Sequence, residues 1–358
     1  MAIYINGLSS ISPASEHMQE NFPKALPETQ DGYLKNKNPD YKKYISPMAL
    51  RRMSKGVKMG IFAANACLEN AQLKSPDAIV TGTGLGCIED TEKFLVTMIQ
   101  NKEKLLNPTP FIQSTHNTVS SQISLFLKCH AYNITYAHKG LSFEMALMDS
   151  IMLINENESS HVLTGGIDEI TFHSWFLQKR LGIFKNATKS DIDNISKSTS
   201  KGSVAGEGAA FFMISDTAGP STYASIGGVK FWEGHEFSNK AIINNIDNFL
   251  KEKNLKSSDI DILYLGYSGN SESDRIYDEV SRTLFAHTPQ ACFKNVCGEY
   301  QTATANAMAL AALSIKKQHI PQYARLQGYF DKPLKNILIY NHYQNINHSL
   351  IWLHHDNL

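Results

Sequence analysis

The fold of this chain is decided by the stretch Gly206-Glu207-Gly208-Ala209-Ala210-Phe211-Phe212-Met213-Ile214. Residues 209–215 are an apolar run of strand length, which predicts a buried strand. The run is also a dividing line, because the order of predicted strands and helices before it is repeated after it. The stretch therefore indicates a chain made of two related halves.

Predicted strands and helices alternate on both sides of this stretch. Before it, we expect strands at 3–8, 78–81, 133–137 and 161–164, and helices at 53–73, 89–100, 117–127 and 142–155. After it, we expect helices at 241–254, 273–283 and 302–315, and strands at 261–265 and 349–352. The polar residues 185–202 predict a loop. This alternation predicts an α/β fold with layered sheets.

The composition indicates an ordinary globular protein. Its 34 Lys and Arg balance 34 Asp and Glu, so we expect no general attraction to nucleic acid or to an anionic membrane. The first residues lack the pattern of a signal peptide, and no run of about 18 apolar residues exists that would predict a membrane span. Five cysteines without CxxC spacing predict a reduced, cytoplasmic protein without a metal site, and no cofactor is expected.

Short fragments across nearly the whole chain, read in order, resemble the β-ketoacyl-ACP synthases of the thiolase superfamily. The fragments are Ile5-Asn6-Gly7-Leu8 through Ser12-Pro13, Arg51-Arg52-Met53-Ser54, Gly82-Thr83-Gly84-Leu85-Gly86, Asn117-Thr118-Val119-Ser120-Ser121-Gln122-Ile123, Leu163-Thr164-Gly165-Gly166-Ile167-Asp168-Glu169 and Ala205-Gly206-Glu207-Gly208-Ala209. The resemblance implies a thiolase-like five-layer αβαβα fold, with an N-terminal half at 1–217 and a C-terminal half at 218–358. It also implies a site whose residues can be checked one by one.

The family's nucleophile is a cysteine at a helix N-terminus, which carries the acyl chain as a thioester. Aligned with this motif, the segment 137–143 places Gly140 at the cysteine position and Phe143 at the glycine that follows it. Glycine has no side chain and cannot form a thioester. A shift of the alignment would make His138 or Ser142 the functional residue instead.

The family's two histidines support decarboxylation of malonyl-ACP and stabilise the negative charge that develops. The first histidine position holds Ser268, in Ser268-Gly269-Asn270. The second holds Glu299, at the end of a segment that begins with the retained Lys294. A carboxylate beside a developing enolate would repel it. Glu299 and Lys294 could equally form an internal ion pair.

The resemblance also assigns residues around the site and at a subunit contact. A glycine-rich gating loop of the family becomes residues 342–347, with Tyr343 at the gating position. Because this loop lacks glycine, it should not freely adopt positive φ, and we expect a stiffer or differently shaped loop. Tunnel or gate candidates are Thr91, Phe111, Gln113, Phe143 and Tyr343, and the strand through which family members pair offers Ile134, Tyr136 and His138.

The loss of all three catalytic groups on a retained scaffold resembles the chain length factors of type II polyketide and polyene systems. That resemblance implies a partner, an active β-ketoacyl-ACP synthase, and an acyl carrier protein that delivers substrate. Polyketide, aryl polyene and fatty-acid-like pathways are not distinguished. Two alternatives stay open: a free-standing 3-oxoacyl-ACP synthase that uses Ser142, Ser268 or Glu299, and a non-catalytic homodimer that binds acyl chains or a carrier protein.

The turn 82–86 superficially suggests a phosphate-binding loop. It lacks the Gly-Lys-Ser/Thr ending of a P-loop and the spacing of the dinucleotide fingerprint, so a nucleotide site is not expected. The lysine-rich segment Lys35–Lys43 is interpreted as a solvated surface, with contact to an acidic carrier protein as the alternative.

Overall fold

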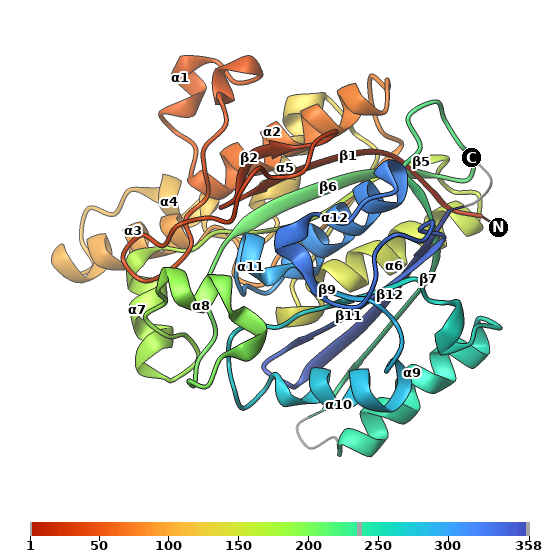
Figure 1. Ribbon diagram of the computed structural model, residues 1–358. Coiled ribbons are helices and arrows are strands. Elements are labelled where there is room, and N and C mark those ends of the chain that lie inside the picture. Colours follow the sequence, from red (N-terminus) through yellow and green to blue (C-terminus); the bar gives the residue numbers. More distant parts are fainter. Residues whose placement is uncertain (1, 235–237, 356–358) are drawn as a thin grey trace.

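The strands form two sets, and corresponding strands follow the same spatial order in both sets (Figure 1). The structure is a computed structural model and describes residues 2–234 and 238–355. The first set contains β1 (Tyr4–Ser12), β3 (Ala78–Gly82), β4 (Tyr132–Tyr136), β5 (His161–Asp168) and β6 (Gly208–Ser215), in the order β4-β3-β5-β6-β1. The second contains β7 (Ala224–Glu233), β8 (Ile262–Leu265), β9 (Gln290–Cys292), β11 (Asn336–Tyr343) and β12 (Asn347–His354), in the order β9-β8-β11-β12-β7.

The strand directions also agree between the two sets. β3 runs parallel to β4 and β5, as β8 runs parallel to β9 and β11. The remaining neighbours within each set are antiparallel. Equal order and equal direction confirm the prediction of two related halves. The division into domains at 217/218, which falls between β6 and β7, stays a prediction.

Helices cover the strands in three layers, which gives the predicted αβαβα arrangement (Figure 1). The middle layer is α6 (Ser142–Asn155) and α12 (Ala303–Lys317), the latter buried throughout 303–315. Outside the first set lie α2 (Lys55–Asn70) and α5 (Thr118–Leu127), and outside the second lie α9 (Asn239–Glu252) and α10 (Arg275–Leu284). Alanines let α12 approach the sheet closely, since a Cβ on Gly166 would meet the Ala305 Cβ at 2.9 Å.

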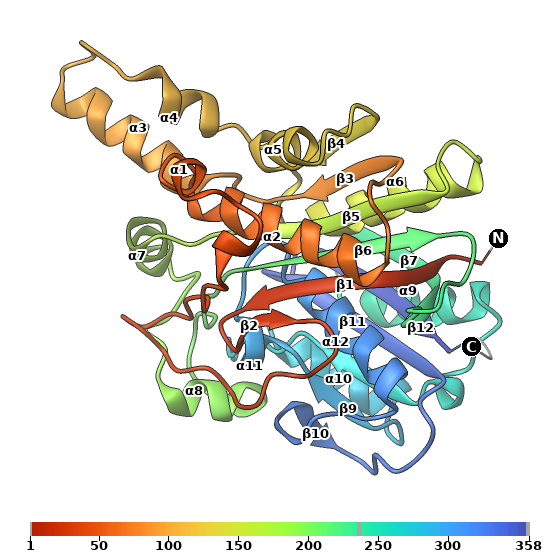
Figure 2. The same cartoon turned by 90° about the horizontal axis from the view of Figure 1, so that it is seen from above.

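Shorter elements join this framework. The two strand sets are linked where β1 pairs with β7, and β2 (Ser15–Met18) and β10 (Arg325–Gln327) extend the sheet beside β1 and β9. The remaining helices are α1 (Pro47–Leu50), α3 (Ile88–Gln100), α4 (Pro108–Gln113), α7 (Phe172–Arg180), α8 (Lys189–Asp193) and α11 (Lys294–Cys297). Figure 2 shows α3 and α4 extending away from the sheets, on the side where α5 and β4 lie.

The carboxylate of Asp168 fastens the first glycine turn to the central helix. It accepts hydrogen bonds from the Gly84 N–H (2.8 Å) and the Leu85 N–H (3.1 Å), and also from the Thr302 hydroxyl (2.8 Å). Asp168 is buried, and burial raises its pKa despite these donors. The turn at 82–86 therefore donates backbone N–H groups to a carboxylate within the chain. Its glycines are required by close contacts, since a Cβ on Gly82 would overlap the Ser142 backbone.

The sequence analysis missed several elements. β9 and β10 have only three residues each, too few to show a period, and glycines interrupt the pattern of β7. β11 was overlooked although its apolar residues 337–340 are fully buried. The prediction of a plain loop at 185–202 is wrong, because α8 begins there with Thr188 and Asp191 forming a capping box.

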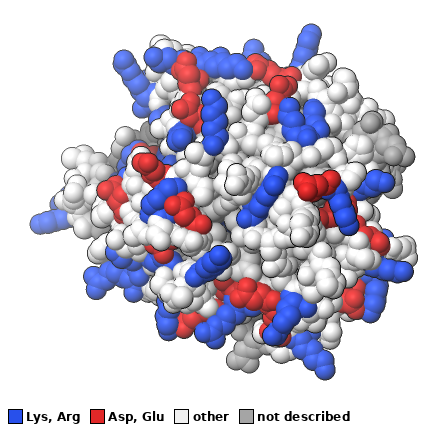
Figure 3. All heavy atoms as spheres, viewed as in Figure 1, with Lys and Arg blue, Asp and Glu red and all other residues white. Residues whose placement is uncertain are grey.

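The surface and the helices agree with the composition. Figure 3 shows acidic and basic side chains interspersed over the face that it presents. Across residues 2–234 and 238–355, no helix combines the length and the apolar character needed to cross a bilayer.

Candidate functional site

The predicted nucleophile position lies in the turn that joins β4 to α6. Gly140 is buried in the middle of η2 (Lys139–Leu141), and the sharpest backbone position is Lys139, with φ of 47°. The Ser142 hydroxyl fixes the turn, because it accepts from the His138 N–H and donates to the Lys139 carbonyl, both at 2.8 Å. Neither Lys139 nor Gly140 carries a thiol. The turn therefore lacks the family's cysteine, whichever of the two residues is aligned with the nucleophile.

Tyr343 occupies the space into which a side chain at position 140 would extend. A Cβ placed on Gly140 would lie 2.8 Å from the Tyr343 Cγ, closer still to its Cβ, and 3.2 Å from the Asn347 Oδ1. Tyr343 is buried, and burial raises the pKa of its phenol. Its hydroxyl accepts a hydrogen bond from the Gln301 Nε2 at 3.1 Å. Position 140 therefore carries no reactive side chain, and Tyr343 fills the space beside it.

Gln301 makes a second contact of the same kind. A Cβ on Gly84 would lie 3.0 Å from the Gln301 Cδ and closer to its Cβ and Cγ. Two side chains of the C-terminal half, Gln301 and Tyr343, thus pack against two glycines of the N-terminal half. The sequence analysis did not find Gln301, because nothing in its local sequence distinguishes it.

The gating segment forms the hairpin between β11 and β12. The Ile346 N–H donates to the Tyr343 carbonyl at 3.1 Å, which closes a tight turn. Gln344 and Asn345 have φ of 54° and 53°. Two residues of this segment therefore adopt positive φ although it contains no glycine, since antiparallel pairing of β11 with β12 imposes a turn of this hand.

Glu299, at the predicted second histidine position, is part of a buried ion pair. The Lys294 ammonium lies 2.8 Å from the Glu299 Oε2 and donates to the His342 carbonyl at 3.2 Å. The other oxygen of Glu299 has no hydrogen-bond partner among the residues that the structure describes. Burial raises the pKa of Glu299 to about 7, and Lys294 opposes that rise. The carboxylate and the ammonium face each other, as the ion-pair alternative predicts.

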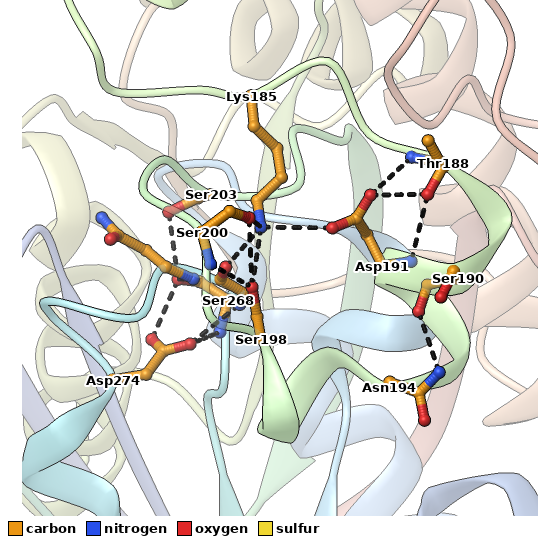
Figure 4. Close-up of polar contacts among 12 residues, drawn as sticks. Lys185, Thr188, Ser190, Asp191, Asn194, Ser198, Ser200, Ser203, Ser268 and Asp274 are labelled. Atoms are coloured by element: carbon orange, nitrogen blue, oxygen red, sulfur yellow. Dashed lines mark hydrogen bonds and ion pairs between the residues drawn. The ribbon is translucent and has the colours of Figure 1, made fainter.

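Ser268, at the predicted first histidine position, is hydrogen-bonded to its neighbours (Figure 4). The Ser268 hydroxyl donates to the Asp274 Oδ1 (2.9 Å) and accepts from the Ser203 hydroxyl (3.0 Å). Two backbone N–H groups, those of Ser268 and Gly269, donate to the second oxygen of Asp274. Burial raises the pKa of Asp274 to about 6, against the effect of Lys294. The serine is thus a link in a structural network.

The thiols elsewhere in the chain are poorly suited to nucleophilic attack. All five cysteines are buried and free. Burial raises the pKa of Cys87 and of Cys292 to about 12 and raises that of Cys67 and Cys297 further. A buried neutral thiol is inert compared with a thiolate at a helix N-terminus.

The tunnel candidates lie on different elements and differ in how far they are exposed. Thr91 on α3 is half-buried and donates to the Cys87 carbonyl at 3.1 Å, whereas Phe111 on α4 is 55% exposed and packs against the Phe94 ring. Gln113 lines a separate hollow beside Arg52. Phe143 is fully buried in the core against Phe212. Their roles in a tunnel stay predictions.

β4 is the last strand of the sheet and has an open edge. On it, Ile134 is 38% exposed and Tyr136 is half-buried. His138 follows the strand and pairs with Glu233 at 2.7 Å, which lowers the pKa of that carboxyl. Tyr132 on β4 and Leu125 and Phe126 on the adjacent helix α5 are also exposed. A second group of exposed apolar side chains, Ile99, Leu105, Phe111 and Ile112, lies on α3, α4 and the segment between them.

The comparison with protein families identifies the class. A family model described as the N-terminal domain of β-ketoacyl synthase matches residues 5–218. This is more than half of the chain, and the chain therefore belongs to the β-ketoacyl synthase family. A search of curated proteins found no match.

Several solved structures are similar over almost the full length. One, described as the ishigamide ketosynthase/chain length factor, has a TM-score of 0.84 at 15% identity, with 99% of both chains covered. A β-ketoacyl synthase from Burkholderia phymatum has a TM-score of 0.81 at 14% identity, with 99% of this chain and 100% of that chain covered. A ketosynthase in complex with its chain length factor from Xenorhabdus doucetiae has a TM-score of 0.78 at 13% identity, covering 99% and 98%. At these identities the likeness shows the fold.

Proposed function

We propose that this chain is a non-catalytic ketosynthase-like subunit, a chain length factor, that works in the cytoplasm with an active β-ketoacyl-ACP synthase. The observation that carries the proposal is the filled nucleophile position, where Tyr343 packs against Gly140. The paired Lys294 and Glu299 support it, because a buried carboxylate stands where the family keeps a histidine. Such a subunit can shape an acyl chain and cannot join its units.

The open edge of β4 supports a paired state. Unpaired N–H and C=O groups of an edge strand favour addition of another strand, and an exposed apolar surface beside it favours burial against a partner. Two of the similar structures, the ishigamide protein and the Xenorhabdus doucetiae complex, are described as a ketosynthase together with a chain length factor. These points support a heterodimer with a cysteine-bearing ketosynthase.

The mechanism that we propose is steric. The partner would hold the acyl thioester on its own cysteine, and this chain would supply part of the tunnel wall from Thr91, Phe111 and Gln113. Each methylene buried in such a tunnel contributes about 0.8 kcal/mol. A bulkier wall residue both clashes with a long chain and removes this gain, so the product becomes shorter. Type II polyketide, polyene and fatty-acid-like products all suit this mechanism.

An acyl carrier protein would approach a basic surface. The segment 35–58 holds eight basic residues and one acidic residue, Asp40. Lys35, Lys43 and Lys55 are paired with Asp31, Glu69 and Glu207, so the candidate contact residues are Lys37, Lys42, Arg51, Arg52 and Lys58. Such a surface attracts an acidic partner even though the whole chain is neutral. A further solved structure of similar fold is described as a type II polyketide synthase acyl-carrier protein in complex with its ketosynthase.

The test uses the purified chain with acyl-ACP and malonyl-ACP. Alone, it should take up no acyl group by intact-protein mass spectrometry and form no condensation product. Co-expressed with a ketosynthase from its own genome, it should elute as a heterodimer and be needed for product formation. Condensation by the isolated chain would overturn the proposal, and a stable homodimer that ignores every ketosynthase would favour the acyl-binding alternative.

A further inference from the structure

One buried ammonium joins three segments beside the Ser268 turn (Figure 4). The Lys185 side chain is 8% exposed and lies 3.4 Å from the Asp191 Oδ1. Its Nζ donates to the hydroxyls of Ser198 (2.9 Å) and Ser200 (2.7 Å) and to the Gly269 carbonyl (2.5 Å). Four oxygens around one nitrogen use all of its donors, so Lys185 is a cross-link and is not available as a base.

The cross-linked segments also touch through their backbones. Residues 198–203, here called the strap, lie against residues 268–274, here called the turn. The Ser271 N–H donates to the Ser200 carbonyl at 3.0 Å, and the Ser203 hydroxyl donates to the Ser268 hydroxyl at 3.0 Å. At its far end the strap passes Gly202, whose φ of 82° and close approach to Phe184 leave no room for a Cβ.

At its inner end the strap is held by backbone hydrogen bonds, because the Ser203 N–H donates to the Ile183 carbonyl (2.9 Å) and the Lys185 N–H donates to the Ser203 carbonyl (3.0 Å). Its outer part has few other contacts. Thr199, Ser200 and Lys201 are exposed, and the Lys201–Glu272 pair at its outer side is exposed on both partners. An exposed ion pair contributes little, whereas a buried charge that satisfies several hydrogen bonds contributes far more. The charge that fastens the strap is therefore that of Lys185.

We infer that residues 198–203 form a strap that Lys185 fastens closed over the turn carrying Ser268 and Asp274. Loss of the ammonium leaves Asp191, two hydroxyls and the Gly269 carbonyl without their donor, and these groups regain partners by taking up water. The strap then opens locally. The core stays folded, because these hydrogen bonds of the Lys185 Nζ are not made to core residues. This inference does not depend on the proposed function, since it concerns the isolated chain.

The experiment compares the wild-type chain with Lys185→Met. Hydrogen exchange at the Ser271 and Lys185 amides, which bond to the strap, should become at least about tenfold faster, since hydrogen bonds to a charged group are lost. Limited trypsin digestion should give new early cuts after Lys197 and Lys201. The matched control is Lys189→Met, which removes an exposed pair with Asp193 on α8 and should change neither readout.

Either of two results with Lys185→Met would overturn the inference. One is exchange and cleavage in Lys185→Met that equal those of the wild type. The other is an opened strap with unchanged exchange at Ser271, which would show that the strap and the turn are independent. If Lys185→Met lacks a cooperative thermal transition, Ser198→Ala/Ser200→Ala removes two acceptors at the surface and should accelerate the same exchange by a smaller factor; no acceleration there would also overturn it.

Discussion

The Cγ of Tyr343 lies 2.8 Å from the point where a Cβ on Gly140 would stand, and the tyrosine is buried there. The backbone of the β11–β12 hairpin holds this side chain, so it cannot simply swing aside. Introducing a thiol at position 140 therefore requires additional space beside Tyr343.

We expect Gly140→Cys to destabilise the protein by roughly 1–3 kcal/mol, the usual cost of forcing a larger group into a packed core. In the double variant Gly140→Cys/Tyr343→Gly, which removes the Tyr343 Cβ as well as its ring, the two losses should be less than additive and the new thiol should be reactive toward iodoacetamide. Urea unfolding and mass spectrometry measure the two effects. Ala137→Cys, at an exposed neighbour, is the control. A single variant as stable as the wild type would show that the space is open.

The buried pair of Lys294 and Glu299 should respond strongly to removal of one partner. Lys294→Met leaves an uncompensated carboxylate and should lower the free energy of unfolding by about 3–5 kcal/mol. The double variant Lys294→Met/Glu299→Gln should lose less than the single variant, because no buried charge is left alone. A double-mutant cycle from denaturant unfolding gives the coupling. Purely additive losses would contradict the pairing.

Glu299 should also affect the pH dependence of stability. Its pKa is raised from the ordinary value of 4.5 to about 7 in the folded chain, so the folded state binds more protons than the unfolded state between these values. The free energy of unfolding should therefore fall as pH rises through this window, and Glu299→Gln should reduce the slope. Unfolding series at pH 4.5, 5.5 and 7 measure it. Glu252→Gln, on the exposed Lys230 pair, is the control and should keep the slope.

Thr91 offers a test of the tunnel wall. In a reconstituted system with an active ketosynthase, Thr91→Trp should shift the products to shorter chains, because the indole occupies volume that the growing acyl chain would fill. Thr97→Trp, on the same helix α3, should leave the distribution unchanged. Chain lengths are read by liquid chromatography and mass spectrometry. An unchanged distribution in the Thr91 variant would count against a wall role for this residue.

The β4 edge offers a test of pairing. A charged side chain on an edge strand opposes strand addition, so Ile134→Lys should abolish the heterodimer in size-exclusion chromatography. Ile134 is partly exposed, and the free energy of unfolding of the isolated chain should change by only about 0.5 kcal/mol. Tyr329→Lys, at a residue that is 87% exposed and far from β4 in the strand order, should leave pairing intact. Persistence of the heterodimer in the Ile134 variant would place the interface elsewhere.

The sequence by itself determined the fold class, because periodicity and the ordered fragments around the run 209–215 are local properties of the chain. The residues at the predicted catalytic positions, Gly140, Ser268 and Glu299, can also be read from the sequence alone. The sequence did not reveal β11 or the turn between β11 and β12, which depend on pairing within the sheet. It also did not reveal α8, which begins at a capping box.

Which side chains lie against Gly140, Gly84 and the turn at Ser268 could be seen in the tertiary structure alone. Tyr343 fills the space beside Gly140, Gln301 fills that beside Gly84, and Lys185 ties a surface strap to the turn at Ser268. In each case the partners are far apart in the sequence and meet because two packed halves bring them together. Close packing depends on the distance between side chains in space, and spacing along one sequence does not encode that distance.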